Sequence, residues 1–153
     1  MNGAETVKDF ILALESQEYS KAAGYLAGDF TYTGLVPRPL NKKQFITLIE
    51  ELKYGMPNLS FNVHDIQQAE VIVQGQMIQA TIQMTGTQSN IMNLVPLSLP
   101  PIPETNRRVT LPEEHLTFLV ENNQIQSITV QPVAGGGIPG VLHQLGIDAP
   151  IIQ

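Results

Sequence analysis

The 153-residue chain contains no cysteine and no tryptophan, and it has few basic side chains. Without cysteine it can form no disulfide, thiolate nucleophile or cysteine-based metal site. Lys and Arg number 8 against 14 Asp and Glu, so the formal net charge is −6. The longest basic runs are Lys42-Lys43 and Arg107-Arg108. Because nucleic-acid binding needs clustered basic residues, we do not expect a nucleic-acid partner.

Long apolar runs are also missing. No window approaches the ~20 apolar residues that a membrane-spanning helix requires. Residues 1–9 are mixed and polar, with no basic region leading into an apolar stretch, so no signal peptide is expected. We therefore expect a cytoplasmic protein that forms one domain over residues 1–153. Only 14% of the residues are charged, which leaves weak charge repulsion and room for self-association. A strand face rich in Gln and Thr and the apolar tail Val141–Ile152 suit a homodimer.

The first third of the chain has the periodicity of amphipathic helices. Apolar residues recur at i, i+3, i+4 and i+7 in three stretches, which are Val7–Leu14, Tyr19–Leu26 and Phe45–Leu52. Asn41 and Gln44 have the spacing of a capping box before the third stretch. Gly28 and Gly55 are expected to end the second and third helices.

Strand-like alternation follows. Extended segments are predicted at Phe30–Thr33, Leu59–Val73, Ile78–Thr85, Thr110–Glu121 and Gln124–Pro132. Turns are expected at residues 35–40, 74–76 and 122–123. Three helices followed by an antiparallel sheet predict an α+β fold, in which the helices cover one face of a curved sheet and a pocket lies between the two layers.

Two segments interrupt this pattern. Residues 88–106 contain four prolines among apolar residues, and a loop of that length is usually functional or disordered. We expect it to fold over the pocket as a lid. In the tail, residues 134–153, the glycines 135–137 suggest a flexible joint. Pro139 then suits the first turn of a short helix whose apolar residues are Val141, Leu142 and Leu145.

Four stretches resemble a known family. They are Tyr19–Leu26, Asp29–Tyr32, Thr85–Thr87 and the ending Gly136–Gly146. Together with the order of elements, they resemble the SnoaL-like polyketide cyclase branch of the nuclear transport factor 2-like superfamily, over nearly the whole chain. The resemblance implies a cone-shaped α+β fold with three N-terminal helices, a curved, mostly antiparallel sheet and a short C-terminal helix. The superfamily includes cyclases, ketosteroid isomerase, dehydratases and transport factors.

The resemblance does not carry over a full set of catalytic groups. SnoaL-like cyclases share an acidic residue beside the last strand, but here residues 128–133 contain no acid. In ketosteroid isomerase-like members, the catalytic Tyr and Asp positions fall on Phe10 and near Gly34. A second oxyanion donor falls at or beside His115. One of the three roles is retained.

His115 is therefore the first candidate for proton transfer, with Glu113 and Glu114 beside it. Strand alternation places Glu113, and not Glu114, on the face of His115. The plain alternative makes His115 a partly exposed strand residue, and structural roles are favoured for His64 and His143. The three histidines have no metal-ligand spacing, so we expect neither a metal nor another cofactor.

Aromatic and methionine residues are spread along the expected helices and strands. They are either plain core or the walls of an apolar ligand pocket. The set is Phe10, Tyr25, Tyr32, Phe45, Met56, Phe61, Met84 and Phe118.

Three functions remain open. The leading hypothesis is a domain that binds a small apolar or polyketide-like molecule. The second is a cyclase or isomerase that acts on a polyketide-like or other carbonyl substrate by general acid/base catalysis, with His115 and Glu113 or Glu114. The third is a non-catalytic dimerisation module.

Overall fold

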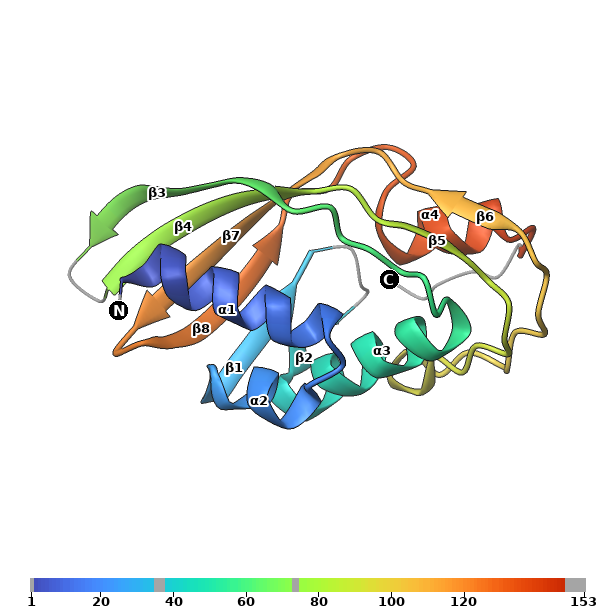
Figure 1. Ribbon diagram of the computed structural model, residues 1–153, viewed down its shortest axis with the longest axis horizontal. Coiled ribbons are helices and arrows are strands. Elements are labelled where there is room, and N and C mark those ends of the chain that lie inside the picture. Colours follow the sequence, from blue (N-terminus) through green and yellow to red (C-terminus); the bar gives the residue numbers. More distant parts are fainter. Residues whose placement is uncertain (1, 35–37, 73–74, 148–153) are drawn as a thin grey trace.

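The computed structural model describes residues 2–34, 38–72 and 75–147. Helices cover one face of a curved sheet, and a short helix lies near one end of it (Figure 1). The helices are α1 (Gly3–Glu15), α2 (Tyr19–Gly24), α3 (Lys42–Gly55) and α4 (Gly137–Gln144). The expected α+β class with three N-terminal helices and a short C-terminal helix is confirmed. Within the described ranges, no helix is both long and apolar enough to cross a membrane.

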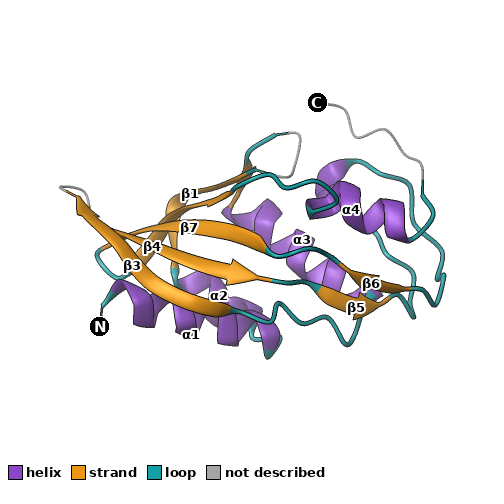
Figure 2. Cartoon of the chain, turned by 90° about the horizontal axis from the view of Figure 1, so that it is seen from above, coloured by secondary structure: helices purple, strands orange, loops and turns teal. Residues whose placement is uncertain are grey.

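The main sheet has six strands in the order β2-β1-β8-β7-β4-β3. Their bounds are β1 (Leu26–Thr33), β2 (Leu40–Asn41), β3 (His64–Ile72), β4 (Gly75–Ile82), β7 (Glu114–Glu121) and β8 (Gln124–Val130). Neighbours are antiparallel except β1 and β8, which run parallel. The short strands β5 (Thr85–Thr87) and β6 (Arg108–Thr110) form a second pair that extends the β4 and β7 ribbon toward α4 (Figure 2).

The ends of α1 and α3 follow the local sequence. Asn41 accepts a hydrogen bond from the Gln44 backbone N–H at 2.8 Å, and the Gln44 side chain accepts one from the Asn41 N–H at 3.0 Å. This is the capping box expected from the spacing, and it satisfies two free helix donors at once. Asn2 caps α1 in a similar way, through the Glu5 N–H at 2.9 Å. Both helices then bury their apolar stripes against the sheet.

Two predicted boundaries are wrong. The second helix ends at Gly24 rather than near Gly28, and β1 begins at Leu26 rather than Phe30. Leu26 pairs with Ile125 of β8, whose N–H donates to the Tyr25 carbonyl at 2.7 Å. A strand partner that is distant in sequence therefore overrides the local helical pattern.

The strand expected from Leu59 begins instead at His64. Asn62 has φ 46°, in the left-handed region that interrupts an extended strand. Asp65, with φ 54°, lies at a register shift inside β3. Before this interruption, Ser60 makes only an isolated bridge to Thr85 of β5. The expected turns at 35–40 and 74–76 lie partly outside the described residues.

The proline-rich segment 88–106 folds against the C-terminal end of α3. Met92 and Ile102 exchange two backbone hydrogen bonds of 2.9 Å, and a 3-10 turn, η1 (Val95–Leu97), lies between them. The Val95 N–H donates to a Glu51 carboxylate oxygen at 3.0 Å, which ties this turn to α3. The loop therefore has its own hydrogen bonds, and it buries Met92, Leu94 and Ile102.

Candidate functional site

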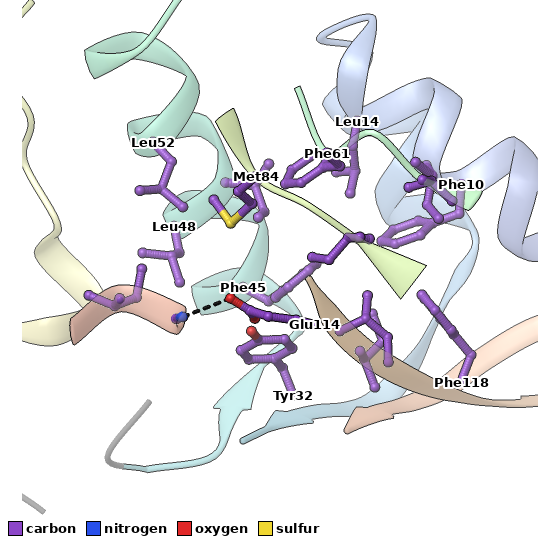
Figure 3. A pocket seen from close by; sticks show the side chains of 18 residues that line it. Phe10, Leu14, Tyr32, Phe45, Leu48, Leu52, Phe61, Met84, Glu114 and Phe118 are labelled. Atoms are coloured by element: carbon purple, nitrogen blue, oxygen red, sulfur yellow. Dashed lines mark hydrogen bonds between the residues drawn. The ribbon is translucent and has the colours of Figure 1, made fainter. Parts of the chain in front are cut away.

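A cavity of about 80 Å³ lies between α1, α3 and the inner face of the sheet. Its wall is built from α1, β1, α3, the segment that leads into β3, β4 with the residues after it, β7, β8 and the first turn of α4. The side chains on this wall are apolar except those of Tyr32 and Glu114, which lie together at one end (Figure 3). The cavity is thus an apolar chamber with one polar end.

Six of the eight aromatic and methionine residues proposed as pocket residues lie on this wall. They are Phe10, Tyr32, Phe45, Phe61, Met84 and Phe118. Met56 is fully buried elsewhere, against Gly86 of β5, and Tyr25 lies at the end of α2. These two are therefore not wall residues. The remaining wall positions include Leu14 and Leu48, on the helix stripes recognised from the sequence.

Glu114 is the one charged side chain on the described wall. It opens β7 on the buried side of the strand, and only 3% of its surface is exposed. One carboxylate oxygen, Oε1, accepts a hydrogen bond of 2.8 Å from the N–H of Gly137, the first residue of α4. Burial raises the pKa of the Glu114 carboxyl, and the hydrogen bond from Gly137 partly opposes this effect. Its other oxygen has no hydrogen-bond partner among the described residues.

Tyr32 is the second polar group of the cavity. Its ring packs against Phe45 with 4.9 Å between the ring centroids, and its hydroxyl is turned toward the Glu114 carboxyl (Figure 3). Burial raises the pKa of the Tyr32 phenol above its ordinary value, and the charge of Glu114 raises it further. At neutral pH the hydroxyl therefore keeps its proton and can donate a hydrogen bond into the cavity.

His115 and Glu113 lie on the opposite face. His115 is exposed, and its Nδ1 is 3.2 Å from the hydroxyl of Thr81 on β4. Glu113 is also exposed and pairs with Nε2 of His64 at 2.9 Å. Proton transfer by His115 inside the pocket requires an inward side chain, and this requirement is not met. Alternation along β7 correctly separates Glu114 from the other two residues.

The segment 88–106, which was expected to cover the pocket, does not line the cavity, whereas the start of α4 does. The α4 residues on the wall are Gly137 and Ile138. Gly135 and Gly137 have φ of 79° and 65°, a conformation that favours glycine and brings the chain back over the sheet. The sequence indicated the helix, but not that its first turn closes the cavity.

Metal ligands do not gather in this region. Across the described residues, no group of three His, Asp or Glu side chains has the arrangement of a metal site.

Comparison with known proteins identifies the fold. No family model matches the chain, and no curated protein matches it significantly. Solved structures do match: AclR, a proposed hydroxylase from Streptomyces galilaeus, superposes with a TM-score of 0.70 at 14% identity, over 95% of this chain and 96% of that one. IdmH, a proposed polyketide cyclase from Streptomyces antibioticus, superposes with a TM-score of 0.67 at 15% identity, over 94% of this chain and 97% of that one.

A third match points the same way. An uncharacterized cystatin-fold protein from Novosphingobium aromaticivorans gives a TM-score of 0.60 at 14% identity, over 86% of this chain and 99% of that one. The chain therefore has the α+β cone fold of SnoaL-like and cystatin-fold proteins, as the sequence resemblance implied. Because one such fold hosts many chemistries, function has to be argued from the cavity.

Proposed function

We propose that this protein binds a small, mainly apolar molecule in the cavity, with the polar group of that molecule at Glu114 and Tyr32. The observation that carries the proposal is the pairing of an apolar chamber with one buried carboxyl, whose second oxygen accepts no hydrogen bond from the residues that the structure describes. Ligand sites generally combine apolar walls with a few convergent polar groups in this way. The hydrogen bond from Gly137 gives a structural role to one oxygen only, and burying the carboxyl costs free energy through desolvation.

The size of the cavity limits the ligand. A free volume of about 80 Å³ is far below the roughly 300–1,000 Å³ of sites for drug-sized molecules. A compact, branched or single-ring compound therefore fits best, with small adjustments of flexible wall residues such as Met84. Several structural neighbours are described as polyketide cyclases, but a polycyclic polyketide is larger than this cavity.

A pair of variants on α1 tests the proposal. Leu14 lines the cavity, whereas Leu12, two residues earlier on the same helix, is 61% exposed. Leu14→Phe adds a ring inside the cavity and Leu12→Phe adds the same ring outside it. Small alcohols, ketones and amines are titrated into each protein by calorimetry, with thermal unfolding followed by circular dichroism.

Compounds that occupy the cavity should bind the wild type and Leu12→Phe alike, and should bind Leu14→Phe at least tenfold more weakly, about 1.4 kcal/mol. Compounds at 100 times their dissociation constant should also raise unfolding stability by about 2.7 kcal/mol. Equal binding to Leu14→Phe, or no binding by any compound, would overturn the proposal.

Proton transfer next to a carbonyl is the second candidate function, because Glu114 and Tyr32 face each other at the polar end. Glu114 in its ionised form would remove a proton from the carbon beside a ketone, while the Tyr32 hydroxyl donates to the ketone oxygen. The raised pKa of Glu114 brings this base closer to neutrality, which suits general base catalysis.

Deuterium exchange into small cyclic ketones, followed by NMR, tests this activity. Catalysed exchange should be lost in Glu114→Gln, weakened in Tyr32→Phe and retained in the exposed-site control Glu113→Gln. Exchange that persists in Glu114→Gln would assign it to another group.

A further inference from the structure

We infer that the polar group of the ligand is a protonated amine, and that this cavity selects cationic over neutral and anionic molecules of the same shape. This inference rests on the proposed binding function. The juxtaposition that carries it is a buried carboxyl with one free oxygen, beside the rings of Tyr32 and Phe45 and without any cationic side chain on the described wall.

The charge of the wall is the first argument. None of the described residues that line the cavity is a Lys, Arg or His. A carboxylate or phosphate ligand would enter an apolar space, lose its water and meet the like charge of Glu114 with no cation to compensate. Such a transfer is strongly unfavourable. Anionic ligands are therefore excluded by the same residues that would hold a cation.

The free oxygen of Glu114 is the second argument. Gly137 occupies Oε1, and its N–H stabilises the ionised carboxylate. The second oxygen then remains for the ligand, and the hydroxyl oxygen of Tyr32, turned toward it, offers a further acceptor. An ammonium group has several N–H donors and can donate to both oxygens. A ligand alcohol can donate to the Glu114 oxygen and accept from the Tyr32 hydroxyl, but it carries no charge to pair with the carboxylate.

The aromatic rings provide the third argument. Phe45 packs against Phe10 and Tyr32, at centroid distances of 6.3 and 4.9 Å, and the rings of Phe45 and Tyr32 lie beside Glu114 (Figure 3). Aromatic faces attract cations, and the attraction is larger where water is excluded. The same rings accept the hydrocarbon part of the molecule. The class of ligand that matches both features is a compact primary or secondary amine with a branched or cyclic hydrocarbon group.

The protonation state of Glu114 determines how strongly an amine binds. Burial desolvates the Glu114 carboxyl and raises its pKa, and the Gly137 N–H opposes this effect only in part. An ammonium ion supplies the missing partner, and a hydrogen bond between two charged groups is stronger than one between neutral groups. Binding should therefore strengthen as pH rises and Glu114 loses its proton, up to the pH at which the amine itself is deprotonated.

Two matched sets of probes test the inference on the intact protein. One is isopentylamine, isopentanol and isovalerate, and the other is benzylamine, benzyl alcohol and benzoate. Each is titrated by calorimetry into the wild type, Glu114→Gln and Glu113→Gln. Glu114→Gln keeps the shape of the side chain and removes its charge, while Glu113→Gln removes the same charge from an exposed position one residue away.

The amine of each set should bind the wild type about 10- to 100-fold more tightly than the alcohol, and the carboxylate should not bind measurably. Glu114→Gln should abolish the preference for the amine while keeping the affinity for the alcohol. Glu113→Gln should leave the preference unchanged.

The possible failures are distinct. If the alcohols bind as tightly as the amines and Leu14→Phe weakens both, the inference is wrong and the proposed binding function stands. If the amine preference persists in Glu114→Gln, or is lost equally in Glu113→Gln, the selectivity comes from surface charge and the inference is also wrong. If no member of either set binds, the inference is overturned together with the binding of small apolar molecules.

Discussion

Gln88 is a fully buried polar side chain, and its removal gives a quantitative test of the proline-rich loop. Its Nε2 lies within 3.2 Å of the carbonyls of Asn90, Ile102 and Pro103, and its Oε1 accepts a hydrogen bond of 2.8 Å from the Thr105 hydroxyl. The amide has two N–H donors, so three carbonyls share them. One side chain therefore joins both ends of the 88–106 segment.

Gln88→Ala removes this network. The Ile102 carbonyl keeps its hydrogen bond from the Met92 N–H, whereas the carbonyls of Asn90 and Pro103 lose the donor that Gln88 supplied. Each hydrogen bond contributes a net ~1 kcal/mol, and carbonyls near the loop edge recover part of the loss from water. We expect a loss of about 2–4 kcal/mol in the free energy of unfolding. For a chain of this length, that corresponds to a fall of about 5–15 °C in Tm. Thermal unfolding by circular dichroism, supported by urea titration, measures the loss.

Gln83→Ala is the matched control, because the half-buried Gln83 makes a single hydrogen bond of 3.2 Å to the Leu111 carbonyl. Its loss should cost about 1 kcal/mol. Equal effects of the two substitutions would refute the reasoning about the network. In addition, Gln88→Ala should not change ligand affinity, since the loop does not line the cavity. Weaker ligand binding in Gln88→Ala would instead indicate that residues 88–106 cover the cavity.

Three further predictions concern charge and glycine. The pKa of the Glu114 carboxyl is raised in the folded state, so the free energy of unfolding should fall as pH rises from about 4.5. Glu114→Gln should remove this fall. Urea unfolding curves recorded across the pH range measure it. In Gly136→Ala the added methyl would lie 2.8 Å from Oε1 of Glu114, so we expect the free energy of unfolding to fall by about 1–3 kcal/mol. Gly24→Ala is the control and should change it little, because its added methyl meets nothing within 4 Å. The pKa of His64 is raised mainly by its hydrogen bond to the Asn62 carbonyl and further by nearby carboxylates. Its contribution to stability should therefore be present below about pH 6.5 and be lost as pH rises above that value. The difference in unfolding free energy between wild type and His64→Gln should shrink as pH rises through this value, and also in high salt.

Local sequence rules predicted most of the fold because they act within a few residues. The Asn41 cap and the apolar stripe of α3 lie within one helix, and alternation along β7 fixed which face each side chain occupies. The errors occur where a distant partner decides the structure. Pairing with Ile125 turned Leu26 into a strand residue.

In the candidate site too, local patterns predicted some features and contacts between distant residues determined the others. Glu114 is one of three candidate groups in the sequence, and alternation separates it from His115, but sequence reasoning favours the histidine because an imidazole can act as base or donor near neutral pH. What makes Glu114 distinctive is its contact with Gly137, which lies 23 residues away along the chain. No local pattern predicts that contact. The expected homodimer and cytoplasmic location remain predictions, and sedimentation at micromolar concentration tests the first.

The contact between Glu114 and α4 also has a consequence for the order in which the protein is made. The cavity wall runs from Phe10 on α1 to Ile138 on α4, so synthesis from the N-terminus supplies its last part only when residues 137–144 emerge. Until then Glu114 lacks its backbone donor and the chamber is open on that side. A nascent chain that ends before α4 therefore has an incomplete wall around this space. A ligand present during synthesis can bind there before the first turn of α4 completes the wall.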